Sequence, residues 1–227
     1  MRRVPLFPLP GTVFFPGVRL PLHIFEPRYR EMMEDTLDGS QHMVIVLLKP
    51  GWDRDYHGCP PVHEVATVGV VEEYEKLPDA RYNLVVKGVE KVRLLDPAEP
   101  DGGDLVPGKG YRARWIRPIA ETTPKPGSIE ESQTRIELLQ LWKQLVEEAG
   151  LKDREHGSLT AYAPFDQLVN QAASLLDLPP AVKQELLECN DLLERARSIL
   201  SHLEEQVLHW STIRRFRNLA PEDPRLN

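Results

Sequence analysis

Residues 4–29 read VPLFPLPGTVFFPGVRLPLHIFEPRY, and this stretch decides the class of fold. Short apolar segments alternate with Pro-Gly pairs at residues 10–11 and 16–17, which are typical of turns. Proline lacks the N–H that a central strand donates, so we expect strands built from these segments at a sheet edge or a barrel rim. Pro27 stands where a helix can begin, because the first helical position needs no N–H donor.

The rest of the first half continues the pattern of short strands. A helix is predicted from Pro27 to Gly39, because Tyr29, Met32, Met33 and Leu37 follow helical spacing. Runs rich in β-branched residues separated by turn signals predict further strands, and several short strands of this kind indicate a small, partly closed β-barrel. The expected strand segments are residues 4–9, 13–15, 18–22, 42–49, 65–74, 81–86, 89–95 and 111–119, with a break at Lys87-Gly88.

The second half changes to a helical period. Ser128-Ile129-Glu130-Glu131 has the Ser-x-x-Glu form of a capping box, which marks a helix start. Apolar residues at helical spacing then predict helices over 129–149, 165–176, 180–188 and from about 191 to 217. We therefore predict an α+β fold, with a β subdomain over residues 1–119 and a helical subdomain over residues 120–227.

Composition limits the classes of function. The chain has 227 residues, two cysteines and a net charge of −7. Residues 1–118 hold 16 Lys and Arg against 17 Asp and Glu, and residues 119–227 hold 12 against 18, so neither half has the positive surplus that nucleic-acid binding requires. No apolar run approaches the ~20 residues that span a bilayer, and no signal peptide is evident. We expect a cytoplasmic protein in a reducing compartment.

Several blocks of the sequence resemble one known family. Residues 4–9, 13–17 and 20–29 are similar to the opening signature of the Lon amino-terminal domain. Val68-Gly69-Val70-Val71 resembles its second block, and residues 79–88 resemble a third. The family usually has Gly where this chain has Ala80, and an Arg-Phe-Arg pattern where this chain has Glu90-Lys91-Val92-Arg93. Residues 184–195 resemble the helical part, so the resemblance covers residues 4 to about 208.

The resemblance implies a fold and a role. It implies a PUA-like, partly closed β-barrel followed by an all-α helical bundle, in the form of small bacterial proteins that hold this domain without ATPase or protease domains. It further implies a module that helps to select and hold substrate polypeptides. We accordingly expect a protein that binds unfolded or flexible polypeptides, as an adaptor or chaperone-like protein that works with a protease or chaperone partner.

No enzymatic machinery is predicted. A phosphate-binding P-loop needs Gly-x-x-x-x-Gly-Lys-Ser/Thr, and the nearest segment, residues 103–110, ends in Gly108-Lys109-Gly110 without the hydroxyl residue. We name no catalytic residue and no cofactor. A small enzyme with an unrecognised site stays open as an alternative, which a buried and strongly shifted acid or histidine would support.

One loop collects residue types that can bind metal. His57, Cys59, His63 and Glu64 lie within eight residues, but Pro60-Pro61 interrupts the paired spacing of a structural zinc site. We favour a polar surface loop and predict no metal site. The carboxylates Glu72, Glu73 and Glu75 are interpreted as a solvated strand edge that blocks unwanted pairing, rather than as an acid–base pair.

The predicted polypeptide-binding surface lies at the junction of the two subdomains, with core packing as the alternative for its apolar members. Glu26 also fits a helix start, where an acid complements the dipole, and Arg28 can pair with it. The candidates are Phe14, Phe15, Phe25, Glu26, Arg28, Tyr29, Met32 and Met33.

Two other surfaces were weighed. The apolar stripe Leu192 to Trp210 fits core packing, while Trp210, Ile213 and Phe216 among arginines fit a sticky helix end that mediates dimerisation or docking. An RNA-binding module is the alternative function, with Arg112, Arg114 and Arg117 on one strand as its support and the acidic balance against it. The oligomeric state and the clients stay open.

Overall fold

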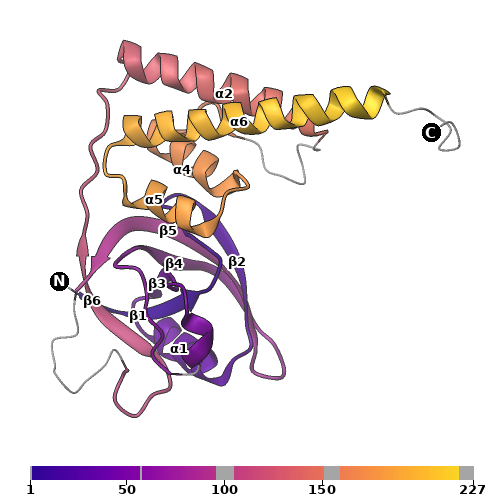
Figure 1. Ribbon diagram of the computed structural model, residues 1–227. Helices are drawn as coiled ribbons and strands as arrows, with labels where there is room; N and C mark the ends of the chain where they lie inside the picture. The colour runs from indigo at the N-terminus through magenta and orange to yellow at the C-terminus, as the bar shows by residue number, and fades with distance from the viewer. Residues whose placement is uncertain (1, 57, 96–104, 151–158, 220–227) are drawn as a thin grey trace, which may run out of the picture. The chain divides into compact units, whose positions relative to one another are not determined.

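The computed structural model describes residues 2–56, 58–95, 105–150 and 159–219. The chain divides into two compact units, residues 1–121 with 177–190, and residues 122–176 with 191–227. The first unit is built on a six-stranded sheet and the second on helices (Figure 1). The predicted α+β class is therefore confirmed.

The sheet of the first unit closes partly on itself. Its strand order is β2-β5-β4-β3-β1-β6, and an additional pairing joins β5 to β6. Closure is possible because β5 is long: residues 82–87 pair with β2, and residues 92–94 pair with β6. The partly closed barrel is confirmed. The strands are β1 (Arg2–Leu9), β2 (Arg19–Ile24), β3 (His42–Leu47), β4 (Val65–Lys76), β5 (Tyr82–Leu94) and β6 (Arg112–Pro118).

The proline-rich opening forms one edge strand and one inner strand. β2, which contains Pro21, pairs with β5 alone among the described residues, so its predicted edge position is confirmed. The same prediction was wrong for β1, which lies between β3 and β6. Pro5 lies where β1 pairs only with β6, and Pro8 where it pairs only with β3, so each proline leaves its missing N–H on an unpaired side.

Two details of the predicted strands are corrected. Residues 13–15 are not a strand; Phe14 instead accepts a hydrogen bond on its carbonyl from the Thr67 hydroxyl. The expected break at Gly88 is also wrong, because β5 continues through it. A Cβ atom on Gly88 would lie 2.3 Å from the Phe15 carbonyl oxygen, so this glycine permits a close backbone approach rather than ending the strand.

Helix α1 (Pro27–Asp38) completes the core of the barrel, with Pro27 in its first turn as predicted. The side chains of Met32 and Met33 are fully buried. They pack with aromatic and aliphatic residues of the sheet, including Phe7, Phe14 and Tyr82. A second cluster is built from residues of β1, β3, β4, β5 and β6, and in β1 and β3 these residues alternate with those that pack against α1, so they lie on the other face of these strands.

A short helix from the second half of the sequence belongs to the first unit. Helix α5 (Pro180–Glu188) places Gln184 so that its side-chain amide donates to the Val65 carbonyl at 2.9 Å. The buried ammonium of Lys91 donates to the Cys189 carbonyl at 3.0 Å and lies 2.9 Å from the Glu121 carboxylate. By their contacts, residues 177–190 group with the strands of the first unit.

The second unit consists of α2 (Ile129–Ala149), α4 (Phe165–Leu175) and α6 (Leu192–Leu219), with α2 and α6 packed together (Figure 1). The predicted cap is present, since the Ser128 side chain accepts from the Glu131 N–H. Inside the unit, the fully buried Arg195 donates to the Asn170 side chain at 2.7 Å. No helix among the described residues is long and apolar enough to span a membrane.

Candidate functional site

Most apolar candidates of the predicted polypeptide-binding surface lie in the core of the first unit. Phe14, Phe15, Met32 and Met33 are each at most 3% exposed, and Tyr29 is 6% exposed. A buried face and an exposed binding face give the same apolar spacing in the sequence, so the sequence could not decide which of the two these residues form. In the structure all five are core residues.

Phe25 is the exception among the apolar candidates. It follows β2 directly, is 61% exposed, and its ring stacks on the His23 ring at a centroid distance of 6.1 Å. His23 is itself exposed and hydrogen-bonded to Asn83 at 2.7 Å. Phe25 therefore offers an apolar surface at the end of the edge strand, held in place by its neighbour.

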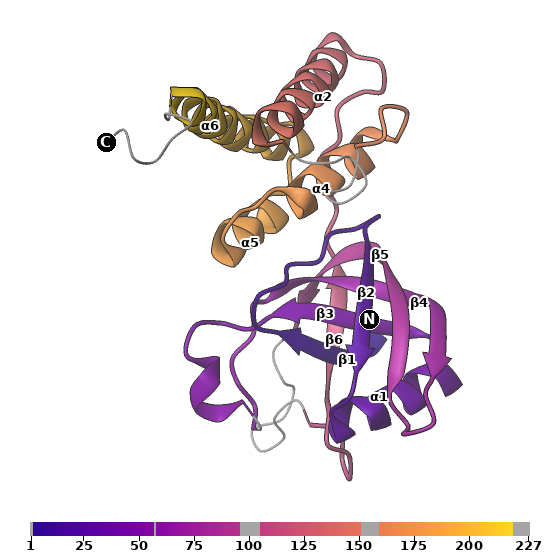
Figure 2. The same cartoon turned by 90° about the vertical axis from the view of Figure 1, so that its right-hand side faces the viewer.

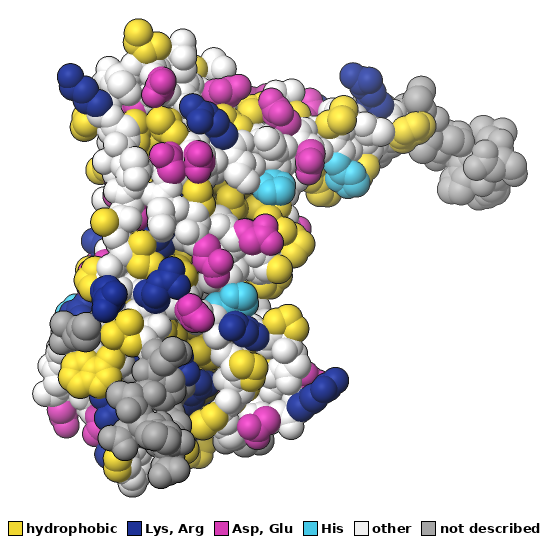
Figure 3. Space-filling view, turned by 60° about the vertical axis from the view of Figure 1, so that its left-hand side comes forward, with side chains coloured by type: hydrophobic (Ala, Val, Ile, Leu, Met, Phe, Trp, Pro, Cys, Tyr) yellow, Lys and Arg dark blue, Asp and Glu magenta, His cyan; other side chains and the backbone are white. Residues whose placement is uncertain are grey.

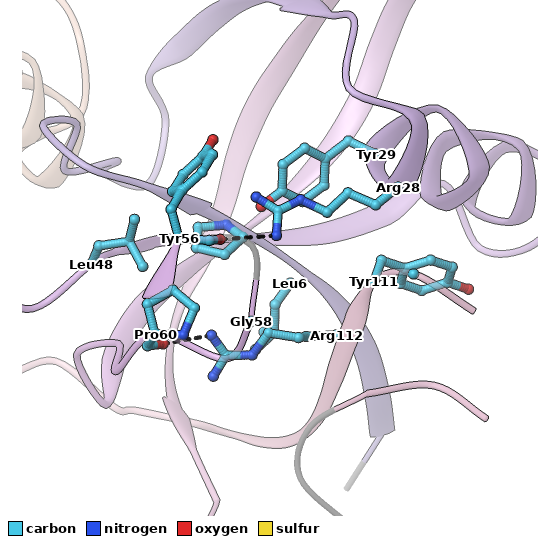
Figure 4. A pocket seen from close by; sticks show the side chains of 11 residues that line it. Leu6, Arg28, Tyr29, Leu48, Tyr56, Gly58, Pro60, Tyr111 and Arg112 are labelled. Carbon is cyan, nitrogen blue, oxygen red and sulfur yellow. Dashed lines mark hydrogen bonds between the residues drawn. The ribbon is translucent and has the colours of Figure 1, made fainter. Parts of the chain in front are cut away.

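Glu26 and Arg28 form an ion pair, one of the two roles considered for them. The Arg28 guanidinium lies 3.1 Å from the Glu26 carboxylate, and the Tyr56 hydroxyl donates to the other Glu26 oxygen at 2.6 Å. Arg28 also donates to the Tyr56 carbonyl and lies over the rings of Tyr56 and Tyr29, 4.8 and 4.6 Å from their centroids (Figure 4). We call Glu26, Arg28 and Tyr56 the clasp, because they tie the loop before β4 to the start of α1.

The pocket beside the clasp is too small for a ligand. Its volume is about 10 Å³, which is room for about one water molecule. Arg112 lines it from β6 and donates to the Pro60 carbonyl at 2.7 Å (Figure 4). Burial raises the pKa of Tyr29 to about 12. These features describe a packed junction of α1, β6 and the loop before β4.

The metal-binding interpretation of the loop cannot be followed for His57, which lies outside the described residues. Cys59 is exposed, and its N–H donates to the Asp55 side chain. His63 lies 3.6 Å from a Glu188 oxygen. Among the described residues, no three His, Cys, Asp or Glu side chains are placed to share a metal ion.

The arginines of β6 do not form one exposed stripe. Arg112 is buried, Arg114 is half-buried and Arg117 is exposed. Because alternate strand residues face opposite sides, Arg117 lies on the other face from Arg112 and Arg114. Trp115, 45% exposed, instead stands opposite Arg3 of β1, and Arg117 stands opposite Arg93 of β5. Trp115 and Arg117 are therefore the residues of β6 that present an aromatic ring and a cation to solvent, beside Arg3 and Arg93.

The end of α6 carries exposed apolar side chains, as one of the two interpretations predicted. Phe216 is 69% exposed and Leu208 is 68% exposed, while Trp210 and Ile213 are half-buried beside the end of α2. Figure 3 shows hydrophobic side chains near this end of the helix. Val207 and the stripe before it are buried within the helical unit, which confirms core packing for that part.

The largest hollow among the described pockets lies on the first unit, over strands β2, β5 and β4. It is an open groove of about 530 Å³, a size typical of ligand sites. Its outer-face side chains include Pro21, His23, Val85, Glu73 and Glu75. The sequence predicts a solvated strand edge for Glu73 and Glu75, and no pattern in it places them in the same groove as residues of β2.

Residues 72–76, the second part of strand β4, form the acidic side of this groove. Residues 65–71 of β4 are mostly buried, and residues 67–70 among them pair with both β3 and β5. Residues 72–76 are all exposed and pair with β5 alone among the described residues. Tyr74, in the middle of this segment, is 56% exposed. The interpretation of these carboxylates as part of a strand edge is therefore in agreement with their position.

The fold agrees with what comparison with known proteins finds. Residues 3–205 match the family model described as the ATP-dependent protease La (LON) substrate-binding domain. The chain belongs to this family.

Its relatives are longer proteins. The Lon protease of Paraburkholderia phytofirmans is 28% identical over 210 residues, and Lon protease 1 of Bdellovibrio bacteriovorus is 26% identical over 207 residues. Each match covers 89% of this chain but 24% of the relative, so the chain spans about a quarter of the length of these curated relatives.

Solved structures show the same fold. The N-terminal domain of the Mycobacterium avium complex Lon protease matches 89% of this chain and 98% of its own, with a TM-score of 0.62 at 14% identity. A Lon N-terminal domain protein from Xanthomonas campestris matches 88% of this chain and 98% of its own, with a TM-score of 0.58 at 20% identity.

Proposed function

We propose that this chain is a non-catalytic polypeptide-binding module that holds unfolded or flexible segments. One observation carries the proposal: the open groove of about 530 Å³ on β2, β5 and β4, together with two exposed aromatic side chains near it. Phe25 stacks on His23, and Tyr74 lies on the opposite face of the edge segment of β4. Exposed apolar groups with polar rims on a stable scaffold are the physical requirement for binding varied polypeptides.

Family membership supports the same function. The family is described as a substrate-binding domain, and the matched relatives are Lon proteases. Because the matches cover about a quarter of those relatives, we extend only the recognition step to this chain. The proposal includes an adaptor or chaperone-like role in which a separate protease or chaperone receives the held polypeptide. Cys59 and Cys189 are not joined in a disulfide, which fits a reducing compartment such as the cytoplasm.

Fluorescence polarisation with a labelled, permanently unfolded protein tests the proposal. We expect saturable binding with a dissociation constant on the order of tens of micromolar, because a shallow groove without deep pockets gives few fully desolvated contacts. Addition of ATP should leave the titration unchanged. Absence of binding at ten times that concentration would reject the proposal, as would equal binding of the same protein in its folded state.

A second titration addresses the RNA-binding alternative, for which the exposed Trp115 among Arg3, Arg93 and Arg117 is the relevant observation. Structured RNA is titrated at low and high salt. Polypeptide recognition predicts weak RNA binding, because Arg93 is already paired with Glu64 at 3.1 Å and the net charge is −7. RNA binding that is tighter than polypeptide binding and falls steeply with salt would favour the alternative.

A further inference from the structure

The unpaired half of β4 presents backbone groups as well as side chains. Antiparallel pairing alternates residues that bond to the partner strand with residues that point away from it. The Leu77 N–H donates to the Arg81 carbonyl at 2.8 Å, so Leu77 points to β5, and by alternation Glu75 and Glu73 do too. The N–H and C=O groups of Tyr74 and Lys76 therefore point to the open side.

The other side of β5 gives an independent check on this alternation. The Gly88 N–H donates to the Val18 carbonyl at 2.8 Å, so Gly88 and the even-numbered residues before it point to β2. The odd-numbered residues Val85 and Asn83 then point to β4, where they stand opposite Glu73 and Glu75. The hydrogen bonds on both sides of β5 therefore agree that the N–H and C=O groups of Tyr74 and Lys76 point outward.

Nothing among the described residues pairs with this edge. The last contact on that side is the Val71 N–H, which donates to the Gln41 carbonyl at 3.0 Å, and β3 begins after that point. Residues 72–76 contain no proline, so both outward N–H groups are present. An extended polypeptide segment has the complementary donors and acceptors at the required spacing.

The side chains at the edge select the chemistry of that segment. Glu73 and Glu75 share the outer face with Asn83 and Val85, and Glu73 has no ion-pair partner among the described residues. Tyr74 faces the opposite side and is 56% exposed. In a strand added here, every second residue would lie beside the Glu73 and Glu75 carboxylates. The residues between them would lie on the face of the Tyr74 ring.

We propose that residues 72–76 of β4 capture an extended client segment with alternating basic and apolar residues, which adds to the sheet as an antiparallel strand. This inference rests on the proposed polypeptide-binding function and names its site and mode. Cross-strand neighbours lie about 5 Å apart, so Lys or Arg opposite Glu73 and Glu75 forms direct pairs. A second copy of the same edge would instead bring acids opposite acids, which disfavours self-association.

The probe is a fluorescein-labelled decapeptide of five Lys-Val repeats, titrated against the full chain by polarisation. We expect it to bind about tenfold more tightly than the Glu-Val peptide, since two partly exposed ion pairs replace two repulsive contacts. The Glu73→Gln/Glu75→Gln variant should remove most of this preference and its salt dependence. Glu204→Gln/Glu205→Gln on α6, with the same change of charge, should leave both unchanged.

Backbone pairing is tested separately from charge. In an antiparallel addition, peptide residues opposite Tyr74 and Lys76 point their N–H groups to β4, and these are the valines. N-methylation of all valine amides should abolish binding, whereas N-methylation of all lysine amides should retain it. Equal effects of the two methylation patterns, or no effect of either, would overturn strand addition.

Variants of Tyr74 provide the matching change in the protein. Tyr74→Pro removes an outward N–H without removing a bond to β5, and Tyr74→Val removes the aromatic ring but keeps that N–H. We expect at least about fivefold weaker peptide binding for the proline variant than for the valine variant, at unchanged circular dichroism.

If the chain binds unfolded protein but shows none of these differences, the edge is not the site and the broader function stands. If it binds neither unfolded protein nor peptide, both proposals fail.

Discussion

The Tyr56 hydroxyl donates a 2.6 Å hydrogen bond to the carboxylate of Glu26, a residue thirty positions earlier in the chain. The same carboxylate pairs with Arg28, whose guanidinium lies over the Tyr56 ring. Glu26 and Arg28 came from the most family-like stretch of the sequence, yet their partner is in a loop that no motif marked. Their contacts join the start of α1 to this loop.

Removing the Tyr56 hydroxyl should weaken the clasp. Tyr56→Phe keeps the ring over Arg28 but leaves one Glu26 oxygen without this donor, so we expect a loss of about 1–2 kcal/mol in the free energy of unfolding. Urea unfolding followed by circular dichroism measures it. Tyr162→Phe is the control, because Tyr162 is 98% exposed and should change stability by less than about 0.5 kcal/mol. Equal midpoints for the two variants would show that the clasp adds no stability.

Tyrosine ionisation should destabilise the protein in alkali. The pKa is raised to about 12 for both Tyr29 and Tyr111, in each case chiefly by burial, while an unfolded tyrosine titrates near ~10. The folded state therefore holds these protons more tightly. The resulting stability is fully present below about pH 10 and is lost as the pH rises toward about 12.

Unfolding free energies measured between neutral pH and about pH 12 test this linkage. Tyr111→Phe should reduce the slope of the decline, because it removes one of the tyrosines whose pKa is raised in the folded state. Tyr162→Phe should leave the slope unchanged, since its side chain is exposed in both states. A slope that is the same in all three proteins would contradict the assignment of Tyr111.

The buried ammonium of Lys91 should be among the most costly charges to remove. Its side chain is 1% exposed and pairs with Glu121 at 2.9 Å. Lys91→Met leaves the Glu121 carboxylate and the Cys189 carbonyl without this partner, so we expect a loss of about 3 kcal/mol. Lys143→Met, which breaks a 3.8 Å pair with Glu147 on the surface of α2, should cost less than about 0.5 kcal/mol. Chemical denaturation compares them, and similar losses would show that burial of the Lys91 pair is unimportant.

Gly88 should tolerate no side chain. A Cβ there would lie 2.3 Å from the Phe15 carbonyl oxygen and 3.0 Å from the Cα of Pro16, both backbone atoms. Gly88→Ala must displace the chain before β2, and we expect a loss of at least about 2 kcal/mol. Gly11→Ala is the matched control, because nothing lies within 4 Å of its added Cβ. Thermal unfolding of both variants decides the point, and a wild-type melting temperature for Gly88→Ala would refute the close approach.

Ala80 should be improved by glycine. Its φ is 61°, in the left-handed region that L-residues adopt at a cost, and it lies in the turn between β4 and β5. Relief of that strain exceeds the added entropy of the unfolded chain, so Ala80→Gly should stabilise the protein by about 0.5–1 kcal/mol. Ala181→Gly in α5 should destabilise it by about 1 kcal/mol, since glycine is unfavourable within a helix. The same sign for both substitutions, measured by urea unfolding, would refute the strain at Ala80.

The sequence by itself determined the class of fold, because that information is local. Proline and glycine positions predicted turns, the change from strand to helical period predicted the β and helical parts, and Ser128 marked the start of α2. The family followed from residues 4–29 and later blocks, and residues 3–205 match its model. The Gly-to-Ala difference at position 80 was also visible, although its cost depends on a backbone angle that only the structure supplies.

The tertiary structure alone decided which apolar residues are buried and where chain edges are open. Met32 and Phe25 look equally apolar in the sequence, yet one is fully buried and the other is 61% exposed, because burial depends on neighbours far away in the chain. Likewise, Glu73 and Glu75 became part of a surface only because β3 begins at His42, opposite Val70, and the following residues of β4 pair with β5 alone among the described residues. Long-range strand pairing sets where a sheet stops, and that is not encoded in any short stretch of residues.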